Sequence, residues 1–108
     1  MLNKARQMRK GVVELAVLAI IGRQERYGYD IVEILKTNGL TITEGTVYPL
    51  LTRLRKEGFL DSRLVESELG PARKYYCLTA SGREYLDALS IEWVDLSSGI
   101  YRVLNGDD

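Results

Sequence analysis

The sequence predicts a mainly α-helical fold with one small β-hairpin. Residues 45–60 contain an amphipathic helix with a basic outer face, and residues 60–78 alternate like two paired strands. The final stretch repeats apolar residues in a heptad-like order. Helix, hairpin and helix in this order are typical of a winged helix-turn-helix. We predict a winged helix-turn-helix DNA-binding domain over residues 1–78 and a C-terminal dimerisation helix over residues 79–108.

Composition narrows the class of protein. At 108 residues, the chain is the size of one small domain. It has no histidine and a single cysteine, Cys77, so it lacks a zinc ligand set and the commonest acid-base group. We therefore predict neither an enzyme nor a cofactor. Because no apolar run approaches about 20 residues and the start lacks a signal-peptide pattern, we expect a cytoplasmic protein that does not enter a membrane.

The formal net charge of zero hides a strong asymmetry. Residues 1–83 hold 14 of the 15 lysines and arginines but 9 of the 15 acidic residues, a net charge of +5. Residues 84–108 hold one arginine and six acidic residues, a net charge of −5. This division indicates a basic working end and an acidic tail. The alternative is unevenly distributed surface charge with no functional role.

The first apolar run, residues 12–21, is compatible with a buried strand or a buried helix, and its alanine and leucine content favours the helix. The basic stretch before it, residues 4–10, is either a further phosphate contact or an ordinary soluble start. A second helix is expected from Gly28 to Lys36, ended by Gly39.

The third helix carries an apolar stripe with spacing i, i+3, i+4, i+7, formed by Val47, Leu50, Leu51 and Leu54. Pro49 disfavours a long helix that begins near Thr43, because an interior proline costs about 3 kcal/mol. We therefore expect the regular helix to begin near Thr46 and to end at Gly58.

A hairpin is predicted from the two alternating runs Leu60–Ser67 and Ala72–Leu78, with a turn at Gly70-Pro71. Tyr76 and Leu78 would face one side of it. Thr79 is then well suited to cap the last helix.

The last helix has a seam of apolar residues at alternating spacings of three and four, Leu86, Leu89, Trp93, Leu96, Ile100 and Val103. This seam could pack on its own domain. Because so small a domain has little free surface for it, we predict that the seam forms a homodimer interface.

With these motifs in place, the sequence resembles the PadR family of bacterial transcriptional regulators, especially its short members with one C-terminal helix. The matching stretches are Tyr27-Gly28-Tyr29-Asp30-Ile31, Gly45-Thr46-Val47-Tyr48-Pro49-Leu50-Leu51, Leu54 with Glu57-Gly58, Gly70-Pro71, and Arg73-Lys74-Tyr75-Tyr76 with Leu78-Thr79 and Gly82. The resemblance spans about residues 8–104. It implies a winged helix-turn-helix, a homodimer, and repression of a neighbouring operon that a small molecule relieves.

The candidate DNA contacts lie on the outer face of the third helix and on the predicted hairpin, which is the wing of this fold. They are Thr46, Tyr48, Thr52, Arg55, Lys56, Arg73 and Lys74. Hydroxyl and cationic side chains can donate to phosphate oxygens, and arginine can also read guanine. Arg73 and Lys74 are expected at the wing tip. The alternatives are a merely solvated helix face, or a winged-helix protein-interaction module with no DNA target of its own.

Candidate ligand contacts come from a narrower resemblance, to the multidrug-sensing member of the family. Trp93 falls where that member has a tryptophan in its dimer-interface pore, and Met8 and Leu15 match pore-lining positions. Ser90 departs from the pattern, since an aromatic residue stands at that position in the multidrug sensor. Ser97, one turn after Trp93, could add a polar contact to a planar aromatic effector. Dimer packing alone would also explain Trp93.

Overall fold

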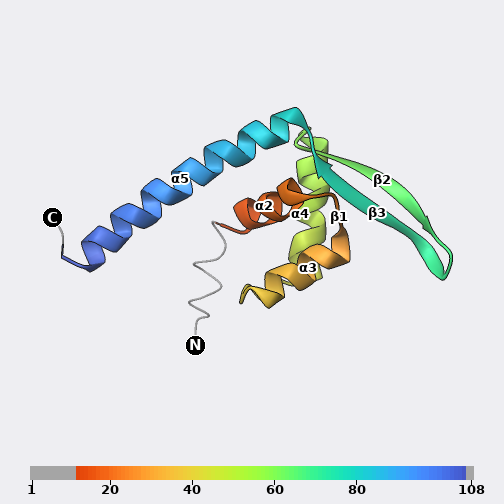
Figure 1. The fold of residues 1–108 in the computed structure, drawn as a ribbon, viewed down its shortest axis with the longest axis horizontal. Helices are drawn as coiled ribbons and strands as arrows, with labels where there is room; N and C mark the ends of the chain where they lie inside the picture. The colour runs from red at the N-terminus through yellow and green to blue at the C-terminus, as the bar shows by residue number, and fades with distance from the viewer. Residues whose placement is uncertain (1–11, 107–108) are drawn as a thin grey trace.

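The computed structural model describes residues 12–106, so Met8 and the basic start lie outside the described part of the chain. In Figure 1 the hairpin and the last helix extend in opposite directions from the helical body of the molecule. The elements in chain order are α2 (Val13–Arg23), β1 (Arg26–Tyr27), α3 (Gly28–Thr37), α4 (Glu44–Lys56), β2 (Leu60–Ser67), β3 (Gly70–Leu78) and α5 (Ala80–Leu104). The predicted winged helix-turn-helix fold is therefore confirmed.

One core joins the helices to the base of the hairpin. The predicted stripe of α4 is confirmed, since Val47, Leu51 and Leu54 are fully buried and Leu50 is half-buried. Each such burial stabilises the fold by about 1.5–3 kcal/mol. The buried core residues are Val17, Leu18, Ile21, Ile31, Leu35, Ile42, Val47, Leu51, Leu54, Leu60, Tyr76 and Leu86.

The first apolar run is a helix, which decides between the two predicted alternatives. α2 packs against α3, α5 and β3, so it meets neighbours on more than one side. That environment explains why its sequence is apolar nearly all round.

The turn between α3 and α4 follows the predicted glycine. α3 runs one residue further than predicted, to Thr37. Gly39 has a positive φ of 81°, a conformation that glycine adopts without steric cost. The Leu40 N–H then donates to the Leu35 carbonyl over 2.8 Å, which closes the end of the helix.

The predicted start of α4 near Thr46 is wrong. The helix begins at Glu44, and the N–H groups of Thr46 and Val47 both donate to the Thr43 carbonyl over 3.0 Å. Pro49 therefore lies inside the helix and deprives the Gly45 carbonyl of its partner. Because Gly45 and Pro49 are both exposed, water can hydrate that carbonyl, and the proline is tolerated.

The sheet contains a strand that sequence reasoning missed. Its antiparallel order is β1-β3-β2, with Arg26 opposite Tyr76 and Tyr27 opposite Tyr75. A two-residue strand is too short to show alternation of apolar and polar residues.

The predicted turn at Gly70-Pro71 is also wrong. The hairpin turns at Glu68-Leu69, and Gly70 pairs with Ser67 inside the ladder. The register shifts between Val65 and Ser67, and Pro71 lies opposite this irregularity. A proline fits there because it has no N–H to donate to a regular ladder.

Thr79 caps α5 as predicted. Its hydroxyl oxygen accepts from the Gly82 N–H over 3.0 Å and donates to the Gly58 carbonyl over 2.6 Å. The cap therefore also ties α5 to the residues that follow α4.

The predicted seam of α5 divides into two parts. Leu86 is buried in the core of its own chain, and Leu89 packs against that core. The remaining seam residues are exposed to solvent, with exposed fractions of 47% for Trp93, 61% for Leu96, 59% for Ile100 and 76% for Val103. Only this second part is available to a second copy, and the domain division at residue 79 stays a prediction.

Candidate nucleic-acid interface

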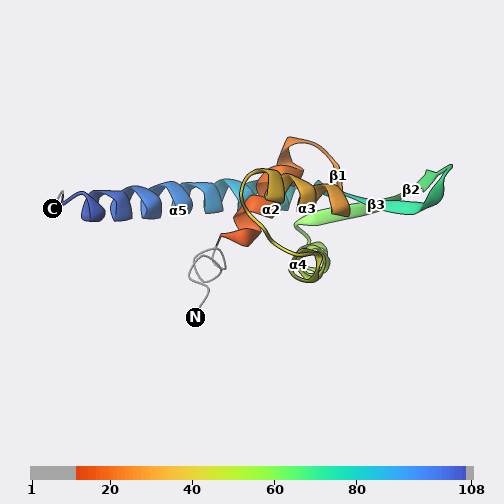
Figure 2. The same ribbon diagram turned by 90° about the horizontal axis from the view of Figure 1, so that it is seen from below.

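One face of α4 carries all five of its predicted site residues. The helix projects from one side of the body, as its end-on view in Figure 2 shows. Its buried stripe holds it against α3 and β2. The opposite, exposed face presents Thr46, Tyr48, Thr52, Arg55 and Lys56.

Tyr48 has a packing role as well as an exposed edge. Its ring covers the start of α3, where a Cβ on Gly28 would lie 2.8 Å from the Tyr48 Cε1. This partial burial raises the pKa of the Tyr48 phenol. The Thr52 hydroxyl donates to the Tyr48 carbonyl over 3.2 Å but remains exposed.

The cations of α4 fall into two groups. Arg53 donates to Glu57 over 2.7 Å and pairs with Glu14 over 3.1 Å. The hydrogen bond to Glu14 raises the pKa of Arg53. Arg55 and Lys56 form no ion pair with another residue in the range 12–106. They are the two cations of this helix with a free charge for an anionic partner.

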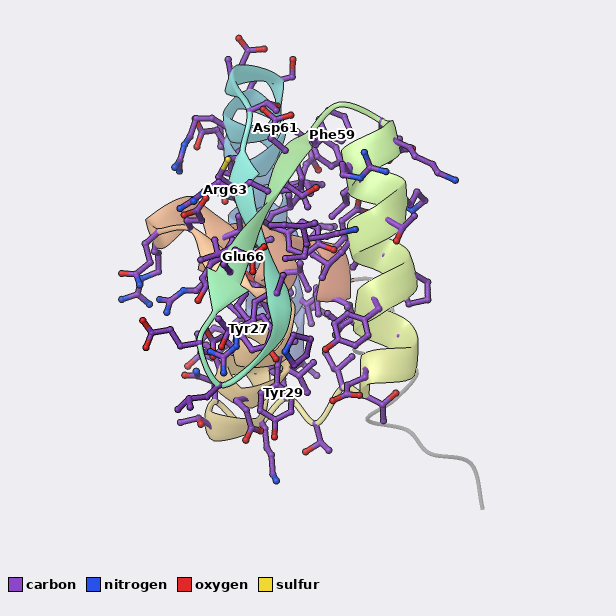
Figure 3. All side chains as sticks on the ribbon, turned by 90° about the vertical axis from the view of Figure 1, so that its right-hand side faces the viewer. Tyr27, Tyr29, Phe59, Asp61, Arg63 and Glu66 are labelled. Atoms are coloured by element: carbon purple, nitrogen blue, oxygen red, sulfur yellow. The ribbon has the colours of Figure 1, made fainter. Side chains whose placement is uncertain are left out.

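A cluster of tyrosines supports the middle of the β2–β3 hairpin, which is the wing of this fold. The Arg73 guanidinium lies 4.8 Å from the centre of the Tyr27 ring, a favourable cation–π contact. The Tyr27 ring is 5.9 Å from Tyr75 and 6.3 Å from Tyr29, measured between centroids. Figure 3 labels Tyr27 and Tyr29 close to the hairpin. The cluster restrains Arg73 without removing its charge.

A second contact fixes the hairpin on the side turned away from α4 (Figure 3). Arg63 donates twice to Glu25, over 2.6 and 2.7 Å. The Arg63 hydrogen bond lowers the pKa of the Glu25 carboxyl. Arg63 is thereby engaged within the chain.

The predicted position of Arg73 and Lys74 at the wing tip is wrong. Because the turn lies at Glu68-Leu69, these cations sit in the middle of the hairpin, opposite Val65 and Leu64. The tip itself carries Leu69, which is 99% exposed. Both cations are nevertheless exposed.

The predicted ligand residues are distributed over two helices. Leu15 is half-buried on α2, and Trp93 is half-exposed on α5. The Ser97 hydroxyl donates to the Val94 carbonyl over 3.3 Å. An open surface cavity of about 330 Å³ lies elsewhere, on α3 and β1, and is lined by Arg26, Asp30, Glu33, Ile34, Thr37 and Asn38.

Between residues 12 and 106 no cluster of three or more potential metal-ligating side chains occurs. Over the same range, no helix has both the length and the apolar character needed to cross a membrane.

Sequence reasoning missed the contacts that restrain these cations. Tyr27 lies under Arg73, and Glu14 pairs with Arg53, yet both pairs are distant in the sequence. No local spacing signals such pairs, since only the packed fold brings them together.

The helix pair α3–α4 followed by the β2–β3 wing defines a winged helix-turn-helix protein. Residues 17–88 match the transcriptional regulator PadR-like family, and the chain belongs to this family. The predicted PadR family is thus confirmed, and the protein is a transcriptional regulator.

Several related proteins align with most of this chain. The PadR-like transcriptional regulator of Bacillus cereus is 41% identical with a TM-score of 0.83, covering 91% of this chain and 96% of its own. Transcriptional regulator Rv3488 of Mycobacterium tuberculosis is 32% identical over 83 residues, 75% of each chain. Bacillus subtilis PadR, whose structure was solved in complex with operator DNA, is 30% identical with a TM-score of 0.69, covering 74% of this chain and 47% of its own.

Proposed function

We propose that this regulator is a homodimeric repressor that binds operator DNA and is relieved by a planar aromatic ligand. The observation that carries the proposal is the exposed face of α4, where Arg55 and Lys56 stand free beside a wing bearing Arg73 and Lys74. The related Bacillus subtilis PadR was solved with operator DNA, which supports the same kind of partner here.

The proposed contacts divide by chemistry. The width of the major groove admits one α-helix, so α4 is the element we expect in it. Arg55 can then read a guanine edge, while Thr46, Tyr48, Thr52 and Lys56 donate to bases or phosphates. The two wing cations, Arg73 and Lys74, would hold the neighbouring phosphates.

The dimer follows from the apolar part of α5 that its own chain leaves uncovered. Trp93, Leu96, Ile100 and Val103 lie along one side of a helix that extends away from the body (Figure 1). Pairing two copies there would shield these side chains and place the two α4 helices symmetrically. A dimer of this kind reads half-sites separated by about 34 Å of DNA.

The rival proposal is a winged-helix module that binds another protein. A salt series on promoter DNA separates the two. Phosphate-led binding should weaken steeply, with a slope of log K against log salt of about −0.9 per neutralised phosphate. Absent or salt-insensitive binding would favour the protein-interaction module.

The first prediction concerns the DNA face. Arg55→Ala or Lys56→Ala should weaken operator binding without changing folding, because both side chains are exposed and form no ion pair with another residue in the described range. A base contact should cost about 1–3 kcal/mol and a phosphate contact should lower the salt slope by about 1. Fluorescence anisotropy with labelled operator measures both quantities.

Arg102→Ala provides the control, since it removes an exposed cation from α5, far along the chain from α4. If the Arg55/Lys56 double mutant bound the operator as tightly as this control, the α4 face would not be the DNA surface.

The second prediction concerns the ligand. In a two-fold dimer the two Trp93 side chains come from equivalent positions, so a flat aromatic compound could insert between them. Leu15, Met8 and Ser97 would complete that site. Such a ligand must bind one dimer geometry better than the other in order to release DNA.

Because Trp93 is the single tryptophan, planar aromatic dyes should quench its fluorescence saturably. Trp93→Ala should bind them about tenfold more weakly by calorimetry, a loss of about 1.4 kcal/mol, while still binding the operator. Equal affinity of the alanine mutant would make Trp93 a packing residue only.

A further inference from the structure

The recognition helix α4 and the long helix α5 are joined at two points. The first joint combines hydrogen bonds from Thr79 with an aromatic stack. The Thr79 N–H donates to the Phe59 carbonyl over 3.1 Å, and the Thr79 hydroxyl donates to the Gly58 carbonyl over 2.6 Å. The Phe59 ring stacks on Tyr85 with 4.3 Å between centroids. The residues that follow α4 are thus attached to the first turns of α5, and Figure 3 labels Phe59 where the chain leads from α4 into the hairpin.

The second joint is polar and centres on one carboxylate oxygen. Glu14 Oε1 on α2 accepts from the Tyr85 hydroxyl of α5 over 3.1 Å, and it pairs with Arg53 Nη2 of α4 over the same distance. Arg53 and Tyr85 therefore share a single acceptor on α2, although they follow Glu14 by 39 and 71 positions in the sequence.

The two joints lie at different points along the chain. Arg53 lies within α4, three residues or about 4.5 Å of helix before its end at Lys56, whereas Gly58 and Phe59 follow that end. The buried stripe holds α4 against α3 and β2, and the contact of Arg53 with Glu14 links the C-terminal part of the helix to α2 and α5 as well. The two joints together restrain α4 at a set angle to α5.

We infer that Glu14 is a positioning residue that sets the angle between the recognition helix and α5 through Arg53 and Tyr85. Under the proposed function, on which this step rests, α5 carries the dimer contacts. The angle of α4 relative to α5 then sets the separation of the two recognition helices and hence the half-site spacing of the operator. A movement of α5 would be transmitted to α4 through the same contacts of Glu14 with Tyr85 and Arg53.

The inference can be tested inside one chain, without DNA. Spin labels at Glu44→Cys and Asp95→Cys, in a Cys77→Ser background, report the distance between α4 and α5, since both labelled positions are exposed. Dilution with unlabelled chain removes distances between copies. Glu14→Ala should broaden the distance distribution about twofold, because it removes the acceptor that links Arg53 to Tyr85.

Glu57→Ala is the matched control. It also removes a carboxylate partner of Arg53, but one that lies directly after the same helix, so it leaves α4 attached to α2 and α5. The control should keep the narrow distribution. Tyr85→Phe removes only the hydroxyl on α5 and provides a second, milder variant should Glu14→Ala unfold. Equal distributions in wild type, Glu14→Ala and Tyr85→Phe would overturn the inference.

Operator spacing gives an independent measurement. Adding one base pair between half-sites rotates them by about 36°, so the wild type should discriminate against it, and Glu14→Ala should lose most of that discrimination. A uniform loss of affinity for both spacings would contradict the positioning role. If the wild type bound no DNA, the proposed function would fail. The distance measurement would still test whether Glu14 restrains α4 relative to α5.

Discussion

Replacing Gly82 with alanine should lower the free energy of unfolding by about 3 kcal/mol or more. A Cβ at this position would overlap the Phe59 carbonyl oxygen and would lie 3.3 Å from Leu78 Cδ2. The carbonyl cannot retreat easily, because it also accepts the Thr79 N–H. The start of α5 would have to move away from the chain that follows α4. Thermal unfolding should show a fall in Tm on the order of 10 °C or more.

Gly99→Ala provides a matched control on the same helix. Among residues 12–106, a Cβ there would come within 4 Å of the Arg102 guanidinium alone, at an ordinary 3.8 Å. Because alanine favours the helix over glycine by about 0.5–1 kcal/mol, this variant should be as stable as the wild type or slightly more so. Equal stability of Gly82→Ala and Gly99→Ala would show that the contact with Phe59 does not constrain the fold.

Introducing a charge at Leu96 should abolish the proposed dimer. Leu96 is 61% exposed in the single chain, so aspartate there would be hydrated and harmless in a monomer. In a dimer the same carboxylate would be buried without a partner, which costs several kcal/mol. Sedimentation should therefore show Leu96→Asp as a monomer or an unfolded chain, with operator binding lost.

Ile91→Asp isolates this effect from the general cost of aspartate in a helix. Ile91 is 63% exposed, nearly the same as Leu96, but it lies about 140° around the helix from it. The control should remain a dimer. If both variants kept the mass of the wild type, or both lost it, the seam from Trp93 to Val103 would not be the interface.

Local sequence determined most of the helical framework. The stripe of Val47, Leu51 and Leu54 has one helical spacing, and burial of that stripe requires no information from distant residues. Thr79 capped α5 as predicted because a cap depends on neighbours within one turn. The outer face of α4 followed from the same periodicity, so its exposed hydroxyl and cationic residues could be named in advance.

Local rules failed where neighbours from another element decide the outcome. Pro49 led to the prediction that α4 begins near Thr46. The helix begins earlier because Gly45 is exposed, so water can hydrate the carbonyl that Pro49 leaves without a partner. Gly70-Pro71 resembled a turn, but the register of the ladder moved the turn to Glu68-Leu69 and with it the place of Arg73 on the wing.

Tertiary structure adds a partner that local spacing does not show. Arg53 pairs with Glu57 one turn later in the chain, but its second partner, Glu14, comes from α2. The tertiary structure also divides the heptad-like seam of α5. Leu86 is buried in the core, where α5 packs against α2, while Leu96 stays exposed. Periodicity specifies which face of a helix is apolar, whereas the identity of the surface that covers that face depends on contacts between segments far apart in the chain.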